Sequence, residues 1–189
     1  MSTTRSPEAT PKTAEEFVRW SQAQPEGERY ELVDGFPVRL QAETVSHAER
    51  KAAVWLALRN ALRQSGADCR AFTDGVCVRV APDRVREPDA LVNCGPYEPG
   101  DLTVPNPVVV VEVVSPSSAF TDNGRKLIDY FALPSILHYL IVYAEESRVV
   151  HHRRADAAGQ IFTAILGRDA DLVLDPPGIT LPVEAFWDD

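Results

Sequence analysis

Two carboxylates in unusual settings are the residues of this sequence best suited to chemistry. Glu112 interrupts a run of valines from Val108 to Val114, and Asp89 directly follows a proline. An ionised carboxylate inside an apolar strand loses its hydration unless a cation, a proton or hydrogen bonds replace it. Two converging carboxylates offer the oxygen ligands that Mg²⁺ or Mn²⁺ prefers, and such a metal can polarise a phosphodiester. The structural alternative places Asp89 at a turn and pairs Glu112 with an arginine.

A hydrolytic site of this kind also needs a cation, because positive charge near the phosphate stabilises the charge that builds in the transition state. Lys126 lies on a predicted helix over residues 122–133, just after the valine run. Asp122, Lys126 and Tyr130 follow one another at intervals of four residues, so they share one side of that helix. This spacing lets Lys126 point back toward the strand. The alternative is a surface ion pair with Asp122, which would contribute little.

Other polar residues are weaker candidates for a site. His47 lies near a predicted helix start, where capping is its simpler role. His151 and His152 are adjacent on a predicted strand, so they point to opposite faces and cannot easily bind one ion together. The sequence has no G-x-S-x-G motif, which disfavours a serine nucleophile. Six basic residues either line a phosphate-facing patch or are simply solvated: Arg84, Arg86, Arg125, Lys126, Arg153 and Arg154.

The valine run predicts the strand that carries Glu112. Valine is β-branched and packs well on a pleated surface, and apolar residues on both sides indicate a central strand that is covered on both faces. The helix over 122–133 follows, and then an apolar run over 138–143. A strand, a helix and a second strand in this order predict a parallel crossover.

The remaining pattern predicts a mixed α+β fold with a central mixed sheet flanked by helices. Capping-box patterns at residues 13–16 and 46–49 each open a helix, and Gly66 closes the second one. Asp34 and Gly35 separate two β-prone runs, which is a hairpin signal. Short strands are predicted over 69–72, 76–80 and 87–92, and strands over 148–153 and 160–166 complete a meander. We expect a single domain over residues 13–189 behind a disordered tail over residues 1–12.

Composition narrows the classes of function. The net charge of −9 over 189 residues disfavours a non-specific binder of polyanions. The sequence has neither a secretory signal nor a run of about 20 apolar residues, so we expect a cytoplasmic protein with no membrane partner. The three cysteines are odd in number and form no CxxC pair. This count predicts reduced thiols and disfavours a disulfide or a zinc site.

An ordered set of motifs resembles a known family. The motifs are residues 29–35 (RYELVDG), 46–47 (SH), 88–89 (PD), 111–118 (VEVVSPSS), 122–130 (DNGRKLIDY) and 137–142 (LHYLIV). Together they resemble the Uma-two family of restriction endonuclease domains, which is placed in the PD-(D/E)XK nuclease superfamily. The resemblance covers roughly residues 15–185 and implies a restriction-endonuclease-like core, a Mg²⁺ or Mn²⁺ cofactor, and a nucleic acid substrate, DNA more than RNA.

The resemblance also implies roles for individual residues. Asp89 and Glu112 would bind the metal, and Glu31 would supply a third carboxylate near the metal or the attacking water. The strand position that holds lysine in the superfamily motif is Val114 here. Lys126, on the next helix, would replace that lysine. His47 stands at a motif position and would be a secondary site residue, together with Asp122 and Tyr130.

Three functions remain open from the sequence. The leading hypothesis is a Mg²⁺-dependent endonuclease. The second is a nuclease-like fold of low or no activity that serves as a binding or oligomerisation module, for example as a homodimer; Val114 and the acidic charge motivate it. The third is metal-dependent hydrolysis of a small phosphoester, which fits the acidic charge but has no motif of its own.

Overall fold

The computed structural model describes residues 10–114, 123–155 and 159–188, apart from the side chain of residue 123. Most of the predicted disordered tail therefore lies outside the described residues, as does Asp122, the first residue of the predicted helix over 122–133. In the described part of the chain no helix is long enough and apolar enough to cross a membrane.

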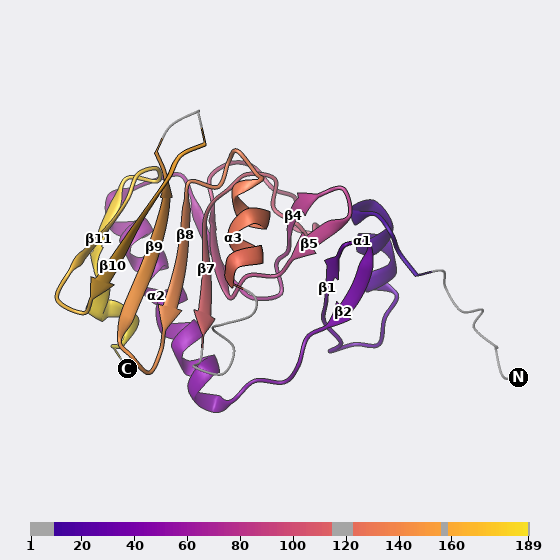
Figure 1. The fold of residues 1–189 in the computed structure, drawn as a ribbon, viewed down its shortest axis with the longest axis horizontal. Helices are drawn as coiled ribbons and strands as arrows, with labels where there is room; N and C mark the ends of the chain where they lie inside the picture. The colour runs from indigo at the N-terminus through magenta and orange to yellow at the C-terminus, as the bar shows by residue number, and fades with distance from the viewer. Residues whose placement is uncertain (1–9, 115–122, 156–158, 189) are drawn as a thin grey trace, which may run out of the picture.

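Three α-helices and three sheets make up the described chain (Figure 1). The helices are α1 (Ala14–Gln22), α2 (Val45–Ser65) and α3 (Asn123–Phe131), and a short 3₁₀ helix, η1 (Val183–Phe186), lies near the C-terminus. The six-stranded sheet has the order β10-β9-β8-β7-β6-β3, with β3 (Arg70–Thr73), β6 (Ala90–Asn93), β7 (Pro107–Val114), β8 (His138–Tyr143), β9 (Arg148–Arg154) and β10 (Ile161–Gly167). A four-stranded sheet has the order β2-β1-β5-β4, with β1 (Tyr30–Val33), β2 (Phe36–Arg39), β4 (Val78–Ala81) and β5 (Arg84–Arg86). Strands β11 (Asp171–Leu174) and β12 (Ile179–Pro182) form a separate pair.

Strand β7 is the central strand that the valine run predicts, and all eight of its residues are buried. Its odd-numbered valines pack with Val54 and Leu58 of α2, whereas Val110 and Val114 pack with Tyr130 of α3. The two helices therefore cover opposite faces of the six-stranded sheet (Figure 1). Glu112 has the parity of Val110 and Val114, so its side chain belongs to the face that α3 covers.

Most of the predicted elements are confirmed. Strands β7 and β8 are parallel neighbours on either side of the α3 crossover. The capping box of α1 is present, with reciprocal hydrogen bonds between Thr13 and Glu16. The β1–β2 hairpin turns through Asp34 and Gly35, both of which have positive φ, as a tight hairpin turn requires.

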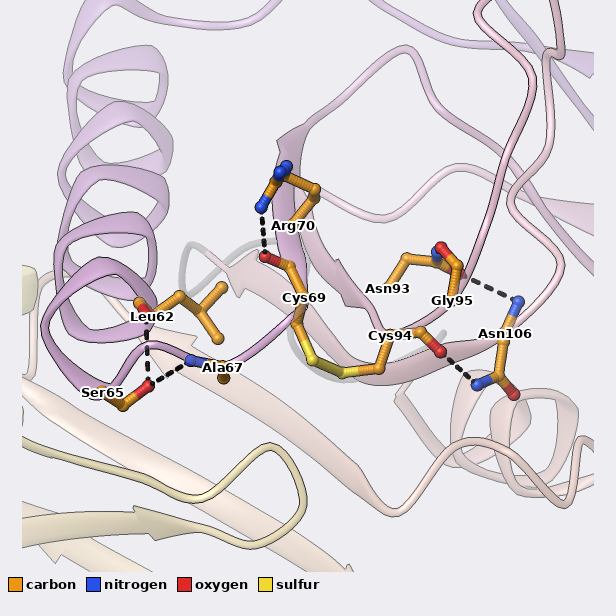
Figure 2. Close-up of a disulfide and its surroundings, with 9 residues drawn as sticks. All are labelled: Leu62, Ser65, Ala67, Cys69, Arg70, Asn93, Cys94, Gly95 and Asn106. Carbon is orange, nitrogen blue, oxygen red and sulfur yellow. Dashed lines mark hydrogen bonds between the residues drawn. A yellow bond between two sulfur atoms is a disulfide. The ribbon is translucent and has the colours of Figure 1, made fainter.

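Two sequence predictions of local structure are wrong. Helix α2 begins two residues earlier than the predicted box, because Thr44 is the N-cap and its side chain accepts a hydrogen bond from the amide of His47. The predicted reduced state of the cysteines fails for Cys69 and Cys94, which form a disulfide (Figure 2). They share the register position next to the Arg70–Asn93 pair of the β3–β6 ladder, so the pairing of these strands brings their sulfurs together. Strands β5, β11 and β12 were not predicted.

Candidate active site

An open pocket of about 790 Å³ lies where the end of β7 approaches the first turns of α2. Most of the residues that line it are polar or charged, although the strand that supports it is apolar. The charged or titratable residues in the lining are Arg29, Glu31, Glu43, His47, Arg50, Lys51, Asp74, Glu87, Asp89, Glu112, Lys126 and Glu145. Four of the predicted site residues (Glu31, Asp89, Glu112 and Lys126) therefore border one cavity, and His47 borders it with them.

Asp89 and Glu112, called the pocket pair below, converge through the β6–β7 ladder. Ala90 pairs with Val111, so the next register position sets Asp89 opposite Glu112. One oxygen of Asp89, Oδ2, accepts a hydrogen bond of 2.7 Å from the backbone amide of Val113. The antiparallel register thus holds the two carboxylates side by side on rigid strands.

Glu112 is held by two residues of α3 and is 5% exposed. Lys126 Nζ lies 2.9 Å from Oε2, and the Tyr130 hydroxyl donates a hydrogen bond of 2.6 Å to Oε1. Desolvation by burial raises the pKa of Glu112 to about 7, with the negative charges of Asp89 and Glu31 adding to the rise and Lys126 opposing it. Lysine, not the arginine of the structural alternative, is the cation beside this strand glutamate.

Asp89 faces α2 with its other oxygen, Oδ1. Lys51 Nζ lies 3.4 Å from it and His47 Nε2 lies 3.8 Å from it. Burial alone would raise the pKa of Asp89, but the His47 side chain, the Val113 amide and Lys51 together hold that pKa below its usual value. The Asp89 carboxylate in turn raises the pKa of His47. Asp89 is thus kept ionised, whereas the environment of Glu112 favours the protonated form.

Sequence reasoning missed the cation on α2. Lys51 is 7% exposed, and its Nζ lies 2.5 Å from Glu43 and 2.7 Å from Asp74 as well as close to Asp89. Arg29 joins the same group by contacting Asp74 and Glu87. The one available signal was spacing, because Lys51 follows His47 by four residues and so lies on the same side of the helix.

Glu31 borders the pocket, but both of its oxygens are bound elsewhere. Arg86 Nη1 lies 2.8 Å from Oε2, and the backbone amide of Glu87 donates to Oε1 at 3.0 Å. Arg86 also donates two hydrogen bonds to Asp129 Oδ2, at 2.9 and 2.6 Å, and Arg84 contacts the other oxygen of Asp129. We call Glu31, Arg84, Arg86 and Asp129 the arginine network. It ties the four-stranded sheet to α3 at Asp129, one turn beyond Lys126.

The other candidates from the sequence lie apart from the pocket. His151 contacts His138 at 2.9 Å and His152 contacts Thr163 at 2.8 Å, so the adjacent histidines do point to opposite faces. The five arginines that the sequence left open as a phosphate-facing patch all have partners within the protein. Each arginine of that set has its own partner: Arg84 and Arg86 lie in the arginine network, Arg125 pairs with Asp34, Arg153 stacks over Phe162, and Arg154 donates to the carbonyls of Phe131 and Leu133.

The donor chemistry of the pocket pair suits a hard divalent cation. Among the described residues no group of three or more His, Cys, Asp and Glu side chains is arranged to hold a metal. Mg²⁺, however, is commonly held by one or two carboxylates, with water and substrate phosphate completing the octahedron. A buried carboxylate whose pKa is raised by desolvation is also one that a bound cation would stabilise. Asp89 and Glu112 therefore fit Mg²⁺ or Mn²⁺.

Comparison with known proteins agrees with this fold. The structure of a protein from Anabaena variabilis, described as a "putative nuclease belonging to DUF820", superposes with a TM-score of 0.71 at 17% sequence identity, covering 94% of this chain and 98% of that one. An uncharacterized protein from Synechocystis is 27% identical over 145 residues, which are 75% of this chain and 74% of that protein. The family model Uma2, described as "Putative restriction endonuclease", matches residues 14–184. The chain therefore belongs to the Uma2 family.

Proposed function

We propose that this protein is a divalent-metal-dependent nuclease whose active site is the pocket around Asp89 and Glu112. One observation carries the proposal: Lys126 Nζ lies 2.9 Å from Glu112 Oε2 although Val114 occupies the strand position where the superfamily motif has lysine. The helix after the strand thus supplies the cation that the strand lacks. Membership of the Uma2 family supports the reaction class.

In this proposal the pocket pair holds Mg²⁺ or Mn²⁺. The bound metal would polarise the phosphodiester and lower the pKa of a water molecule. Lys126 stabilises negative charge on the phosphate, and Tyr130 fixes the orientation of Glu112 through its hydroxyl. His47 and Lys51 keep Asp89 ionised from the side of α2. Glu31 is assigned to positioning, because its oxygens are bound by Arg86 and by the amide of Glu87.

DNA is the proposed substrate, and the local charge of the pocket bears on how it binds. The protein as a whole carries a net charge of −9, which repels a polyanion at long range. Four cations line the pocket, Arg29, Arg50, Lys51 and Lys126, but seven carboxylates line it with them, so the pocket itself is also net negative without a bound metal. Binding is therefore expected to be weak at long range and to depend on Mg²⁺ or Mn²⁺ at the site.

Cleavage assays test the proposal directly. Purified protein is incubated with supercoiled plasmid, single-stranded DNA and RNA in Mg²⁺ or Mn²⁺, alongside Glu112→Gln, Lys126→Met and the matched surface control Glu49→Gln. Glu49 is exposed on α2, so its substitution removes a carboxylate without touching the pocket pair. We expect Glu112→Gln and Lys126→Met to lower the rate by about 10²-fold or more. Absence of metal-dependent cleavage, or full activity in Glu112→Gln, would overturn it.

A second candidate function is binding without catalysis, and one observation favours it. Lys51 places an ammonium group 3.4 Å from Asp89 Oδ1, so a protein cation already neutralises one member of the pocket pair. A thermal-shift titration with Mn²⁺ separates the two functions, since a ligand that binds only the folded state raises the melting temperature. A shift that Asp89→Asn abolishes would support the metal site of the nuclease, whereas no shift, or an equal shift in wild type and Asp89→Asn, would favour the binding module.

A further inference from the structure

The three cysteines of the chain have two different environments. Cys77 is free and buried, and burial raises the pKa of its thiol to about 12, so this thiol stays protonated and unreactive. Cys69 and Cys94 are partly exposed and bonded to each other. Of the two environments, that of the disulfide is therefore the nearer to solvent.

The disulfide closes one end of the ladder between β3 and β6. Cys69 and Cys94 are the register positions next to the Arg70–Asn93 pair, and β3 is the outermost strand of the six-stranded sheet. In Figure 2 the bond bridges the two strands beside the turn that follows α2. A bond at the edge of a sheet can open without disturbing the central strands.

The two sulfur atoms differ in their surroundings. A second pocket, of about 480 Å³, is lined by Cys69 and not by Cys94. Three arginines and one aspartate also line it, namely Arg59, Arg63, Arg70 and Asp68. All three arginines are exposed; Arg59 stacks over Trp55, and Arg70 Nη1 donates to the carbonyl of Cys69 at 3.3 Å (Figure 2). The pocket thus has an excess of positive charge beside one sulfur of the bond.

We propose that the Cys69–Cys94 bond is a reversible thiol-exchange site, at which small anionic thiols attack the Cys69 sulfur under guidance from Arg59, Arg63 and Arg70. The thiol functions both as the ligand of the pocket and as the reductant. The charge of the pocket favours anionic thiols over neutral or cationic ones, because a cationic pocket raises the local concentration of anions. The proposal is independent of nuclease activity.

Two thiol molecules are needed to open the disulfide completely. The thiolate of the first attacks Cys69 Sγ, forming a mixed disulfide there and releasing Cys94 as a thiolate, which takes up a proton. A second thiolate then attacks the sulfur of the bound thiol, forming the small-molecule disulfide and releasing Cys69. The protein disulfide gains two electrons, and the two thiols together lose two.

Thiols that differ in charge test the proposal. The oxidised full chain is mixed with 2-mercaptoethanesulfonate (anionic), 2-mercaptoethanol (neutral) or cysteamine (cationic), and opening of the bond is followed by acid quenching, alkylation and mass spectrometry. After correction for thiolate fraction, we expect the ratio of anionic to cationic rates to fall about ten-fold in Arg59→Gln/Arg63→Gln/Arg70→Gln, the lower end of electrostatic rate effects. Salt at about 1 M should give a similar loss.

A variant with the same net charge is the matched control. Arg19→Gln/Arg39→Gln/Arg79→Gln removes three exposed arginines that do not line this pocket and should keep the wild-type ratio. Peptide mapping should find the quenched adduct on Cys69. Equal ratios in wild type and the pocket variant, an adduct on Cys94, or three free thiols in the oxidised protein would each overturn the proposal.

Discussion

Two buried carboxylates, Asp129 on α3 and Glu112 on β7, show how differently the same group can be held. Asp129 is fully buried, and its oxygens receive hydrogen bonds from two arginines, Arg84 and Arg86. Glu112 is almost as buried but has one lysine and one tyrosine hydroxyl as its contacts. The first carboxylate belongs to a closed network inside the protein, whereas the second borders an open pocket.

This difference distinguishes the arginine network, which has a structural role, from Glu112, which belongs to the candidate active site. The arginine network matches each buried charge with charge-assisted hydrogen bonds, which are the strong ones in proteins. Glu112 has a pKa of about 7, so its partners do not fully offset the cost of burying its charge. A cation bound in the open pocket would offset the remaining cost of burying the Glu112 charge. We infer that the arginine network holds α3 in the orientation in which Lys126 contacts Glu112.

The largest predicted effect comes from breaking the arginine network. Arg86→Leu leaves Asp129 and Glu31 buried without their shared partner, and removing one member of a buried ion pair costs about 3–5 kcal/mol. Urea denaturation should show this loss in the free energy of unfolding. Arg79→Leu is the control, because the Arg79–Glu15 pair is solvent-exposed, and it should leave the unfolding midpoint nearly unchanged. Equal midpoints for both variants would refute the structural role of the network.

A pH-dependent effect should follow from replacing Glu112. Its folded-state pKa of about 7 lies above the usual 4.5, so between these values the folded protein binds more protons than the unfolded chain. The free energy of unfolding therefore falls as pH rises through this window, by up to about 1.4 kcal/mol per pH unit. Glu112→Gln should remove this contribution.

The difference between wild type and Glu112→Gln isolates the effect from other groups. His47, whose pKa is raised, also makes stability fall with rising pH, whereas His138 and His151, whose pKa values are lowered to about 4, do the opposite. All three are present in both proteins. Metal-free denaturation series across the window should converge at low pH and separate at high pH. Parallel curves would show that Glu112 has an ordinary pKa.

A smaller effect should come from Tyr130→Phe. The substitution keeps the ring in the core between β7 and α3 but removes the hydroxyl that donates to Glu112 Oε1. Loss of a hydrogen bond to a buried charged group should lower the free energy of unfolding by about 1–3 kcal/mol near neutral pH and raise the pKa of Glu112. Tyr97→Phe, which changes an exposed tyrosine, is the control for loss of a hydroxyl.

Local pattern predicted the strand and helix that bring Glu112 and Lys126 together. A buried strand reveals itself through consecutive valines, and spacing of four residues places Lys126 and Tyr130 on one side of α3. The position of Asp89 needed only the pairing of two strands that are close in the sequence. These features depend on interactions within one strand, one helix or one pair of neighbouring strands.

Contacts between residues that are far apart in the sequence could not be predicted from local pattern. Arg86 and Asp129 are 43 residues apart, and no local pattern marks either as the partner of the other. Cys69 and Cys94 are separated by 25 residues, and their bond follows from the register of β3 and β6. Glu31 was placed near the metal through its motif, but its side chain turns to Arg86, which the motif does not include.

Titration of Glu112 tests the central claim most directly. Nuclear magnetic resonance of isotope-labelled glutamate side chains, assigned with Glu112→Gln, gives the pKa of this carboxyl with and without Mg²⁺. We predict a pKa of about 7 without the metal and a clear decrease when Mg²⁺ is added, because a bound cation favours the ionised form. A pKa near the usual value, or one that Mg²⁺ leaves unchanged, would contradict the account.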